Sequence, residues 1–286
     1  GNEGYQDASF YDSNSAFFSV QKKFNNKHSL NLAAIYAPNR RGKVSPNTQE
    51  VYDLKGTKYN EYWGWQDGEK RNSRVKRVVE PIVILNHDWT IDEDSSLETS
   101  IGFQFGEMGN SRLGYAGGSN PSPAYYQDLP SYFLADSDGP DYEGAYIAQE
   151  NFVNNGQINW NRIYDANITN NLANINAAYV LYEDRVDDTQ ITFNSAYSRE
   201  INDNIKLSTS INYRNLISDN FAEITDMLGG SGYSNIDSFD FLDYNLLVPN
   251  SIIYEGDRFR YHYKMNVEEL SAFAMVDFSF NKLEFF

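Results

Sequence analysis

The stretch that decides the fold is Ile205-Lys206-Leu207-Ser208-Thr209-Ser210-Ile211-Asn212-Tyr213-Arg214. Its odd-numbered residues are mostly apolar and its even-numbered residues are polar, which is typical of a β-strand with two unlike faces. The same alternation recurs over 97–105, 189–201 and 270–280, and strand-like segments cover 15–24, 29–37 and 79–91. The sequence therefore predicts an all-β chain of seven antiparallel strands, with the start of an eighth at 283–286.

Two kinds of connector alternate between these strands. Short connectors rich in Asn and Asp, which tolerate the backbone of tight turns, lie at 25–28, 92–95, 202–204 and 281–282. Long connectors cover about 38–78, 107–188 and 216–269. Loops of that length are uncommon in compact domains, and here they all fall at one end of the predicted sheet. This layout is typical of an antiparallel transmembrane β-barrel with short periplasmic turns and long extracellular loops.

The predicted strands are too few for the barrel that they indicate. Bacterial single-chain barrels have an even number of strands, and the smallest are filled by side chains. A polar strand face needs a wider, wet interior, so we expect residues 1–286 to be a consecutive portion of a larger barrel of about 22 strands. The residues that we expect to face its lumen are Glu98, Gln104, Lys206 and Arg214.

Composition argues against several classes of function. The 40 acidic and 23 basic residues give a net charge of −17. Nucleic acid is itself negatively charged and is bound by basic proteins, so we expect no nucleic-acid partner. Cysteine is absent, and the three histidines (His28, His87 and His262) are too scattered for a zinc enzyme. No Gly-x-Ser-x-Gly elbow is present, and no glycine-rich phosphate loop follows a parallel strand. We therefore expect neither an enzyme nor a cofactor, and we name no catalytic residue.

Charge is distributed unevenly along the chain. The net charge is −9 over 107–188 and −7 over 216–269, but +5 over 38–79. Three explanations are open. The charges could serve solubility and repulsion from anionic lipopolysaccharide, they could shape a mouth for a polar ligand, or the basic loop could pair with its acidic neighbours.

Aromatic rings are frequent in the long loops. Rings near Asn and Asp suit sugar faces and peptide side chains, because apolar faces stack while amides and carboxylates bind hydroxyls. On this basis we predict that Tyr125, Tyr126, Trp160 and Tyr233 contact a ligand. The alternative is that such rings form small cores that order the loops.

One acidic turn deserves comparison with a calcium loop. In Asp136-Ser137-Asp138-Gly139-Pro140-Asp141, oxygen-bearing side chains alternate before and after a glycine. Calcium prefers clustered carboxylates, which makes Asp136, Asp138 and Asp141 a weak candidate. The turn lacks the ordered spacing and the final Glu of an EF-hand. We expect an ordinary acidic turn and no metal site.

Two stretches carry a resemblance to a known family. The first is Trp63-Gly64-Trp65-Gln66-Asp67-Gly68-Glu69-Lys70-Arg71-Asn72-Ser73-Arg74, and the second is Glu80-Pro81-Ile82-Val83-Ile84-Leu85-Asn86-His87-Asp88-Trp89. The strand opening at 12–15 and the turn entry at 21–24 fit the same pattern. Over nearly its whole length, the chain resembles the barrel of a Bacteroidetes-type TonB-dependent outer-membrane receptor.

The resemblance implies a place in the lipid of the bacterial outer membrane and uptake of an oligosaccharide or peptide captured by the long loops. It also implies a plug domain outside these residues, energy from a periplasmic TonB system acting through that plug, and a surface lipoprotein as a candidate lid. Two alternatives are open. One is a soluble or surface glycan-binding or adhesin module, whose apolar strand faces would pack on each other. The other is a passive porin, which would have no plug and no energy partner.

Overall fold

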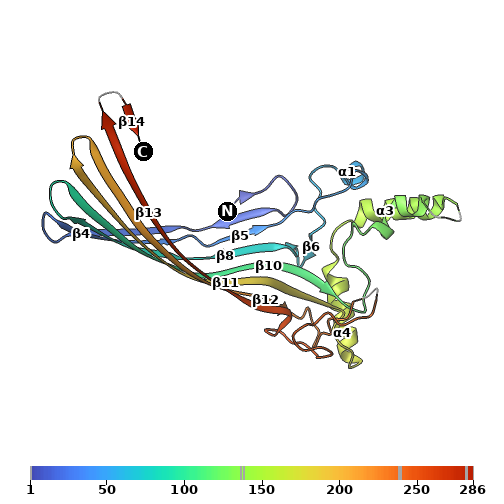
Figure 1. Ribbon diagram of the computed structural model, residues 1–286. Coiled ribbons are helices and arrows are strands. Elements are labelled where there is room, and N and C mark those ends of the chain that lie inside the picture. The colour runs from blue at the N-terminus through green and yellow to red at the C-terminus, as the bar shows by residue number, and fades with distance from the viewer. Residues whose placement is uncertain (1, 136, 138, 238–239, 281–282, 286) are drawn as a thin grey trace.

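The chain forms one large antiparallel sheet with helices gathered at one end (Figure 1). The computed structural model describes residues 2–135, 137, 139–237, 240–280 and 283–285. The strands of the large sheet are β1 (Asn2–Glu3), β2 (Phe10–Ser13), β3 (Ala16–Lys23), β4 (His28–Tyr36), β5 (Asn39–Gly42), β8 (Val75–Val79), β9 (Ile82–Thr90), β10 (Ser95–Tyr115), β11 (Tyr179–Asn202), β12 (Ile205–Asp226), β13 (Arg258–Phe280) and β14 (Leu283–Phe285).

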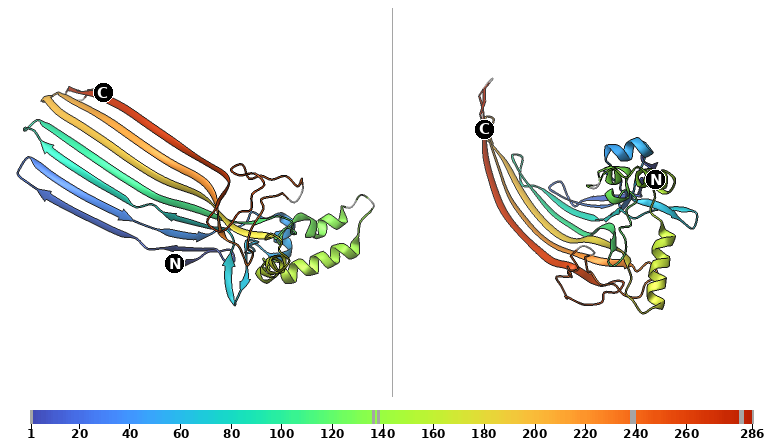
Figure 2. Two further views of the ribbon diagram at one scale, coloured as in Figure 1. Left: turned by 90° about the horizontal axis from the view of Figure 1, so that it is seen from below. Right: turned by 90° about the vertical axis from the view of Figure 1, so that its right-hand side faces the viewer.

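The order of the sheet follows the order of the chain. From β3, each strand pairs antiparallel with the next, through β4, β9, β10, β11, β12 and β13 to β14. The prediction of an antiparallel sheet is confirmed, and the chain is mostly β rather than all-β, because its connecting segments contain helices. The sheet is curved and open in the described part of the chain (Figure 2), so closure into a barrel of about 22 strands stays a prediction.

A crease crosses the first strands at one level. Strands β2, β5 and β8 continue β3, β4 and β9 beyond breaks at 14–15, 37–38 and 80–81. Two of the breaks hold a proline, Pro38 and Pro81, which has no backbone N–H to donate to a neighbouring strand. In β10 the crease meets Gly106, whose φ is +146° and whose Cα lies so close to the Val79 carbonyl that a side chain would collide.

The strands run further toward the loop end than the alternation indicates. The alternation predicts that β10 ends at 105, but the strand continues to Tyr115. Strand β12 also continues from 213 to Asp226. Strands β11 and β13 likewise begin at Tyr179 and Arg258, before the expected 189 and 270. Charges occupy both faces in these extensions, so the period of two is lost although strand pairing continues. The connecting segments are therefore 43–74, 116–178 and 227–257, shorter than predicted.

The connecting segments contain structure that the sequence analysis did not anticipate. The helices are α1 (Gln49–Lys55), η1 (Tyr126–Asp128), α2 (Pro130–Leu134), α3 (Tyr142–Asn155) and α4 (Trp160–Leu172), and a hairpin joins β6 (Trp63–Gln66) to β7 (Glu69–Asn72). Thr48, Asp141 and Asn159 cap three of the helices with a side-chain oxygen. None of the helices described by the structure has the length and apolar character needed to cross a membrane.

Two adjacent rows of side chains define the faces of the sheet. Directly opposed residues on seven neighbouring strands form one wholly apolar row: Val20, Leu32, Leu85, Ile101, Phe193, Tyr213 and Leu270. Their following or preceding neighbours form one wholly polar, uncharged row: Gln21, Asn31, Asn86, Ser100, Asn194, Asn212 and Ser271. Successive side chains point to opposite faces of a strand. The sheet therefore has an apolar face and a polar face, which we name after these rows.

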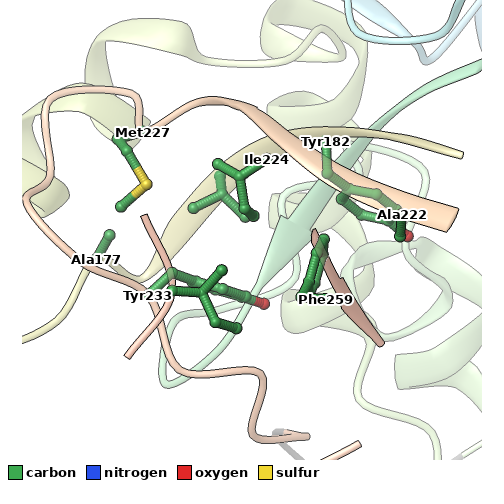
Figure 3. Close-up of a cluster of buried hydrophobic side chains, with 9 residues drawn as sticks. Ala177, Tyr182, Ala222, Ile224, Met227, Tyr233 and Phe259 are labelled. Carbon is green, nitrogen blue, oxygen red and sulfur yellow. The ribbon is translucent and has the colours of Figure 1, made fainter. Parts of the chain in front are cut away.

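The buried core lies at the loop end rather than on the wall. In the largest cluster (Figure 3), Tyr182, Ala222 and Ile224 extend the polar face and pack against Tyr233 and Met227 of segment 227–257. A second cluster packs helix α4 against the other face of β11, and a third joins α1 to α3. Helices and loops therefore cover both faces of the sheet at this end.

Candidate functional site

The loops at this end are tied together by Arg71 of β7. Its guanidinium lies 4.3 Å from the centroid of the Trp160 ring on α4. It donates to Gln66 Oε1 (2.8 Å), to the Tyr164 hydroxyl (3.1 Å) and to Asp226 Oδ2 (2.9 Å). The Trp160 indole in turn donates to the Arg71 carbonyl at 3.2 Å. A base of the 38–79 segment thus pairs with an acid of the 216–269 segment, as the loop-pairing explanation expects.

A second tie is the side chain of Asn167 on α4, which is fully buried. Its Nδ2 donates to the carbonyls of Tyr179 (2.7 Å), Met227 (3.0 Å) and Leu228 (3.1 Å). Its Oδ1 accepts from the backbone N–H groups of Ala178 (2.9 Å) and Tyr179 (3.0 Å). One amide therefore satisfies backbone groups of β11 and of the segment after β12, groups that are expensive to bury unpaired.

The hairpin β6–β7 approaches the chain before α4 through a glycine. The Ile158 N–H donates to the Trp63 carbonyl at 2.9 Å, and Gly64 lies so close to the Ile158 carbonyl that a side chain there would collide. The hairpin β6–β7 therefore packs by one strand edge against the segment that leads into α4, which places Arg71 over Trp160.

Two of the four predicted ligand-binding aromatics are core residues. Trp160 is 0% exposed and Tyr233 is 1% exposed. The Tyr233 ring packs at 6.3 Å from that of Phe259, and burial raises the pKa of its phenol well above the usual value. A ligand cannot reach these rings in this conformation. For Trp160 and Tyr233 the prediction of ligand contact is therefore corrected to the alternative, that they form the small cores that order the loops.

The other two predicted aromatics belong to an exposed strip. The ring centroids of Tyr125 and Tyr126 are 4.9 Å apart, those of Tyr126 and Tyr132 are 5.8 Å apart, and Phe133 follows at 5.6 Å, all edge to face. Tyr126 is 58% exposed and Tyr132 is 46% exposed. We call these four residues the aromatic strip. It is a surface that a flat apolar group could contact, and its binding role stays a prediction.

Helix α1 holds the aromatic strip in place. The Glu50 carboxylate accepts from the Ser131 backbone N–H at 2.9 Å and from its hydroxyl at 2.7 Å. These bonds fix the first turn of α2, which carries Tyr132 and Phe133. Tyr132 and Phe133 are not among the predicted ligand residues, although they are adjacent aromatic residues in a long loop.

The structure describes only part of the acidic turn at 136–141. Asp136 and Asp138 lie outside the described residues. Asp141 is the N-cap of α3, and its Oδ1 accepts from the Gly144 N–H at 2.8 Å. Over the described ranges, the structure brings together no group of three or more His, Asp or Glu side chains that could hold a metal ion. The carboxylate of Asp141 is thus used by the helix.

The residues predicted to face a lumen all lie on the polar face. Glu98 is opposite Ala196, Gln104 is opposite Gln190, and Lys206 and Arg214 alternate with the apolar residues of β12. Arg214 Nε is 3.5 Å from Glu269 Oε2 on the neighbouring strand. Their shared face is compatible with the predicted lumen, which stays a prediction because the sheet is open.

A belt of ion pairs borders the apolar face toward the loop end. Arg185 contacts Glu107, Asp187 (3.0 Å) and Glu223 (3.6 Å), and Arg77 contacts Glu107 and Glu183 (3.5 Å). These residues lie on the same face as Ile101 and Phe193 but further along the strands. The uncovered apolar face therefore ends at this belt of charged side chains.

Comparison with known proteins gives distant structural likenesses. No family model and no curated protein matches the chain. The chain is similar to the RagAB peptide transporter, with a TM-score of 0.46 and 12% identity over 96% of this chain and 27% of that chain. It is also similar to the closed form of the ferric-catecholate import receptor Fiu from E. coli K12, with a TM-score of 0.42 and 9% identity over 97% of this chain and 32% of that one. The chain thus spans about a third or less of either protein.

Proposed function

We propose that this chain forms part of the wall and the extracellular loops of an outer-membrane receptor that imports an oligosaccharide or a peptide. The observation that carries the proposal is the pair of rows on the same seven strands. Six of the seven apolar-row residues are exposed, all but Phe193. A broad uncovered apolar face needs an apolar environment, which lipid supplies, while the polar face suits a wet interior.

The loop end supports the same orientation. The helices and long segments gather at the end of the strands where the ion-pair belt borders the apolar face, and the short turns lie at the other end (Figure 1). Charged side chains at that border would meet the polar headgroups of the outer leaflet. The aromatic strip lies beyond them, where it would meet a ligand before the ligand enters the barrel.

The family resemblance supplies the finer parts of the proposal. They are a plug domain outside these residues, energy from a periplasmic TonB system, and a surface lipoprotein lid. A soluble glycan-binding module would need a second layer over the apolar face, which the six exposed side chains argue against. A passive porin differs only in lacking the plug and the energy partner.

Extraction of the full-length native protein tests membrane placement. We expect it to leave the outer-membrane fraction only with detergent, and to migrate differently on gels before and after boiling, because a folded barrel resists detergent at room temperature. Uptake that stops when a protonophore collapses the energy supply would separate the receptor from a passive porin. A protein that is soluble without detergent would contradict the proposal.

Substitution of the aromatic strip tests ligand capture. Tyr126→Ala combined with Tyr132→Ala is expected to weaken ligand binding by about 2 kcal/mol, roughly thirtyfold, because each ring contact contributes about 1 kcal/mol. The measurement is titration of the detergent-solubilised protein with oligosaccharides and peptides that its host accumulates. Tyr254→Ala is the control, since this ring is 52% exposed and lies in segment 227–257. Equal losses in both variants would contradict a specific role.

A further inference from the structure

Several bases of the 38–79 segment have no acidic partner within the part of the chain that the structure describes. Arg71 and Arg77 form the ion pairs described above. Four other bases form no ion pair with any carboxylate of the described residues, and they lie near Arg112 of β10. They are Arg41, Lys43, Arg74 and Lys76. We call the five residues of this cluster the basic patch: Arg41, Lys43, Arg74, Lys76 and Arg112.

The patch is assembled by strand pairing on the polar face at the loop end. Arg41 of β5 is directly opposite Lys76 of β8, and Lys76 is opposite Asn110 of β10. Arg112 follows two residues later on the same face. Lys43 and Arg74 flank these strands, and the Lys43 N–H donates to the Arg74 carbonyl at 2.7 Å. Bases from three separate segments of the chain, at 41–43, 74–76 and 112, therefore present their charges together.

The backbone under the patch is held rigidly. The Lys43 carbonyl accepts from Nδ2 of Asn60 (3.1 Å) and Nδ2 of Asn72 (2.9 Å), and both asparagines are buried. Asn72 Oδ1 accepts from the Arg74 N–H at 2.8 Å, and the Arg74 guanidinium lies 5.0 Å from the centroid of the Tyr62 ring. A site that is fixed before its ligand arrives loses little entropy on binding.

The electrostatics of the patch are unfavourable without a further anion. Asp184 is the one acid that forms an ion pair with a patch base among the described residues; it pairs with Arg112 and also accepts from the Tyr261 hydroxyl at 2.9 Å. Burial lowers the pKa of the Lys43 ammonium, and the charges of Arg112, Arg74, Lys76 and Arg41 lower it further. Five bases thus lie close together although the chain as a whole is acidic, with a net charge of −17.

We propose that the basic patch binds an anionic group of the imported ligand, so that the ligand is an acidic oligosaccharide or peptide carrying carboxylate or sulfate groups. Guanidinium groups hold such oxyanions with two parallel hydrogen bonds, and ammonium groups add point charges. The import step in this inference rests on the proposed function, whereas the anion binding does not.

Calorimetric titration of the full-length protein in detergent tests the patch. The probes are an oligogalacturonate, an oligoglutamate and a neutral malto-oligosaccharide of similar length. We expect at least one acidic probe to bind about tenfold or more tightly than the neutral one, and its affinity to fall as salt rises from 0.05 to 0.5 M, because salt screens exposed charges. A neutral probe that binds as tightly as both acids would overturn the inference.

Matched variants locate the binding. Lys43→Gln combined with Lys76→Gln should weaken the acidic probe about tenfold or more, while Lys43→Arg combined with Lys76→Arg should retain it. Lys206→Gln removes a charge from the same face at the turn end, and should change nothing. Equal losses with Lys206→Gln overturn the inference. So does unchanged binding in the double Gln variant with a lower melting temperature, which would show that the patch pairs with acids of the same protein.

The two proposals fail separately. If acidic probes bind through the patch but cells do not accumulate them, import fails and the anion site stands. If cells accumulate only neutral ligands, import stands and the anion site fails.

Discussion

Asn167→Ala is expected to lower the free energy of unfolding of the loop assembly by about 3–5 kcal/mol. The substitution leaves two backbone N–H groups and three carbonyls without their side-chain partner in a fully buried position. Each unpaired buried group costs about 1–3 kcal/mol, and local relaxation recovers part of the sum. Because this amide joins α4 to two other segments, we expect all three to loosen together.

Hydrogen–deuterium exchange is the measurement that resolves this loss. Protection should fall over 160–182 and 224–233, while the turn end of β11 and β12 keeps its protection. Asn171→Ala is the control, because Asn171 is an exposed residue on the same helix. If Asn167→Ala exchanges like Asn171→Ala, the amide does not hold the loops together.

Ile101→Arg is expected to abolish the folded, heat-modifiable form of the protein in the outer membrane. Ile101 is in the middle of the apolar row and is 46% exposed. A charged side chain on the lipid face near the middle of the bilayer costs about 2–4 kcal/mol, which is a large part of the stability of an ordinary domain. The measurement is the amount of folded band in outer-membrane fractions.

Ser100→Arg is the matched control for this prediction. Ser100 is the adjacent residue in sequence and belongs to the polar row on the other face of the same strand. It gains the same charge, so a barrel wall predicts a strong effect at 101 and a weak one at 100. If both variants fold, the apolar face does not meet lipid. If only Ser100→Arg fails, the two faces have the opposite orientation.

The sequence was sufficient to locate the strands where they cross the apolar row. There, alternation of residues such as Ile211 and Asn212 directly reports two unlike environments. Beyond that row the alternation ends, because Asp187, Arg185 and Glu223 form ion pairs on the apolar face. A search for period-two alternation therefore could not detect the extended strand ends or the helices α1 to α4.

The candidate site was harder to predict for a related reason. An aromatic residue in a long loop can face solvent or fill a core, and its sequence neighbours do not distinguish the two cases. Tyr126 proved exposed, whereas Trp160 and Tyr233 proved buried. The net charge of +5 over 38–79 showed that bases were in excess. Some of them pair, as Arg71 does, and others form no ion pair within the described ranges, as is the case for Lys43. This difference depends on strand register and could not be predicted from composition.

The crease at 14–15, 37–38 and 80–81 has a mechanical consequence. It interrupts the hydrogen-bond ladder of three successive strands at one level, where the Phe105 N–H reaches the Pro81 carbonyl at 3.3 Å. A sheet bends most easily along such a line. The basic patch residues Arg41 and Lys76 lie on one side of it, and the apolar row lies on the other. The crease thus lets the short strands β2, β5 and β8 leave the direction of β3, β4 and β9, whereas β10 to β13 cross the same level without a break.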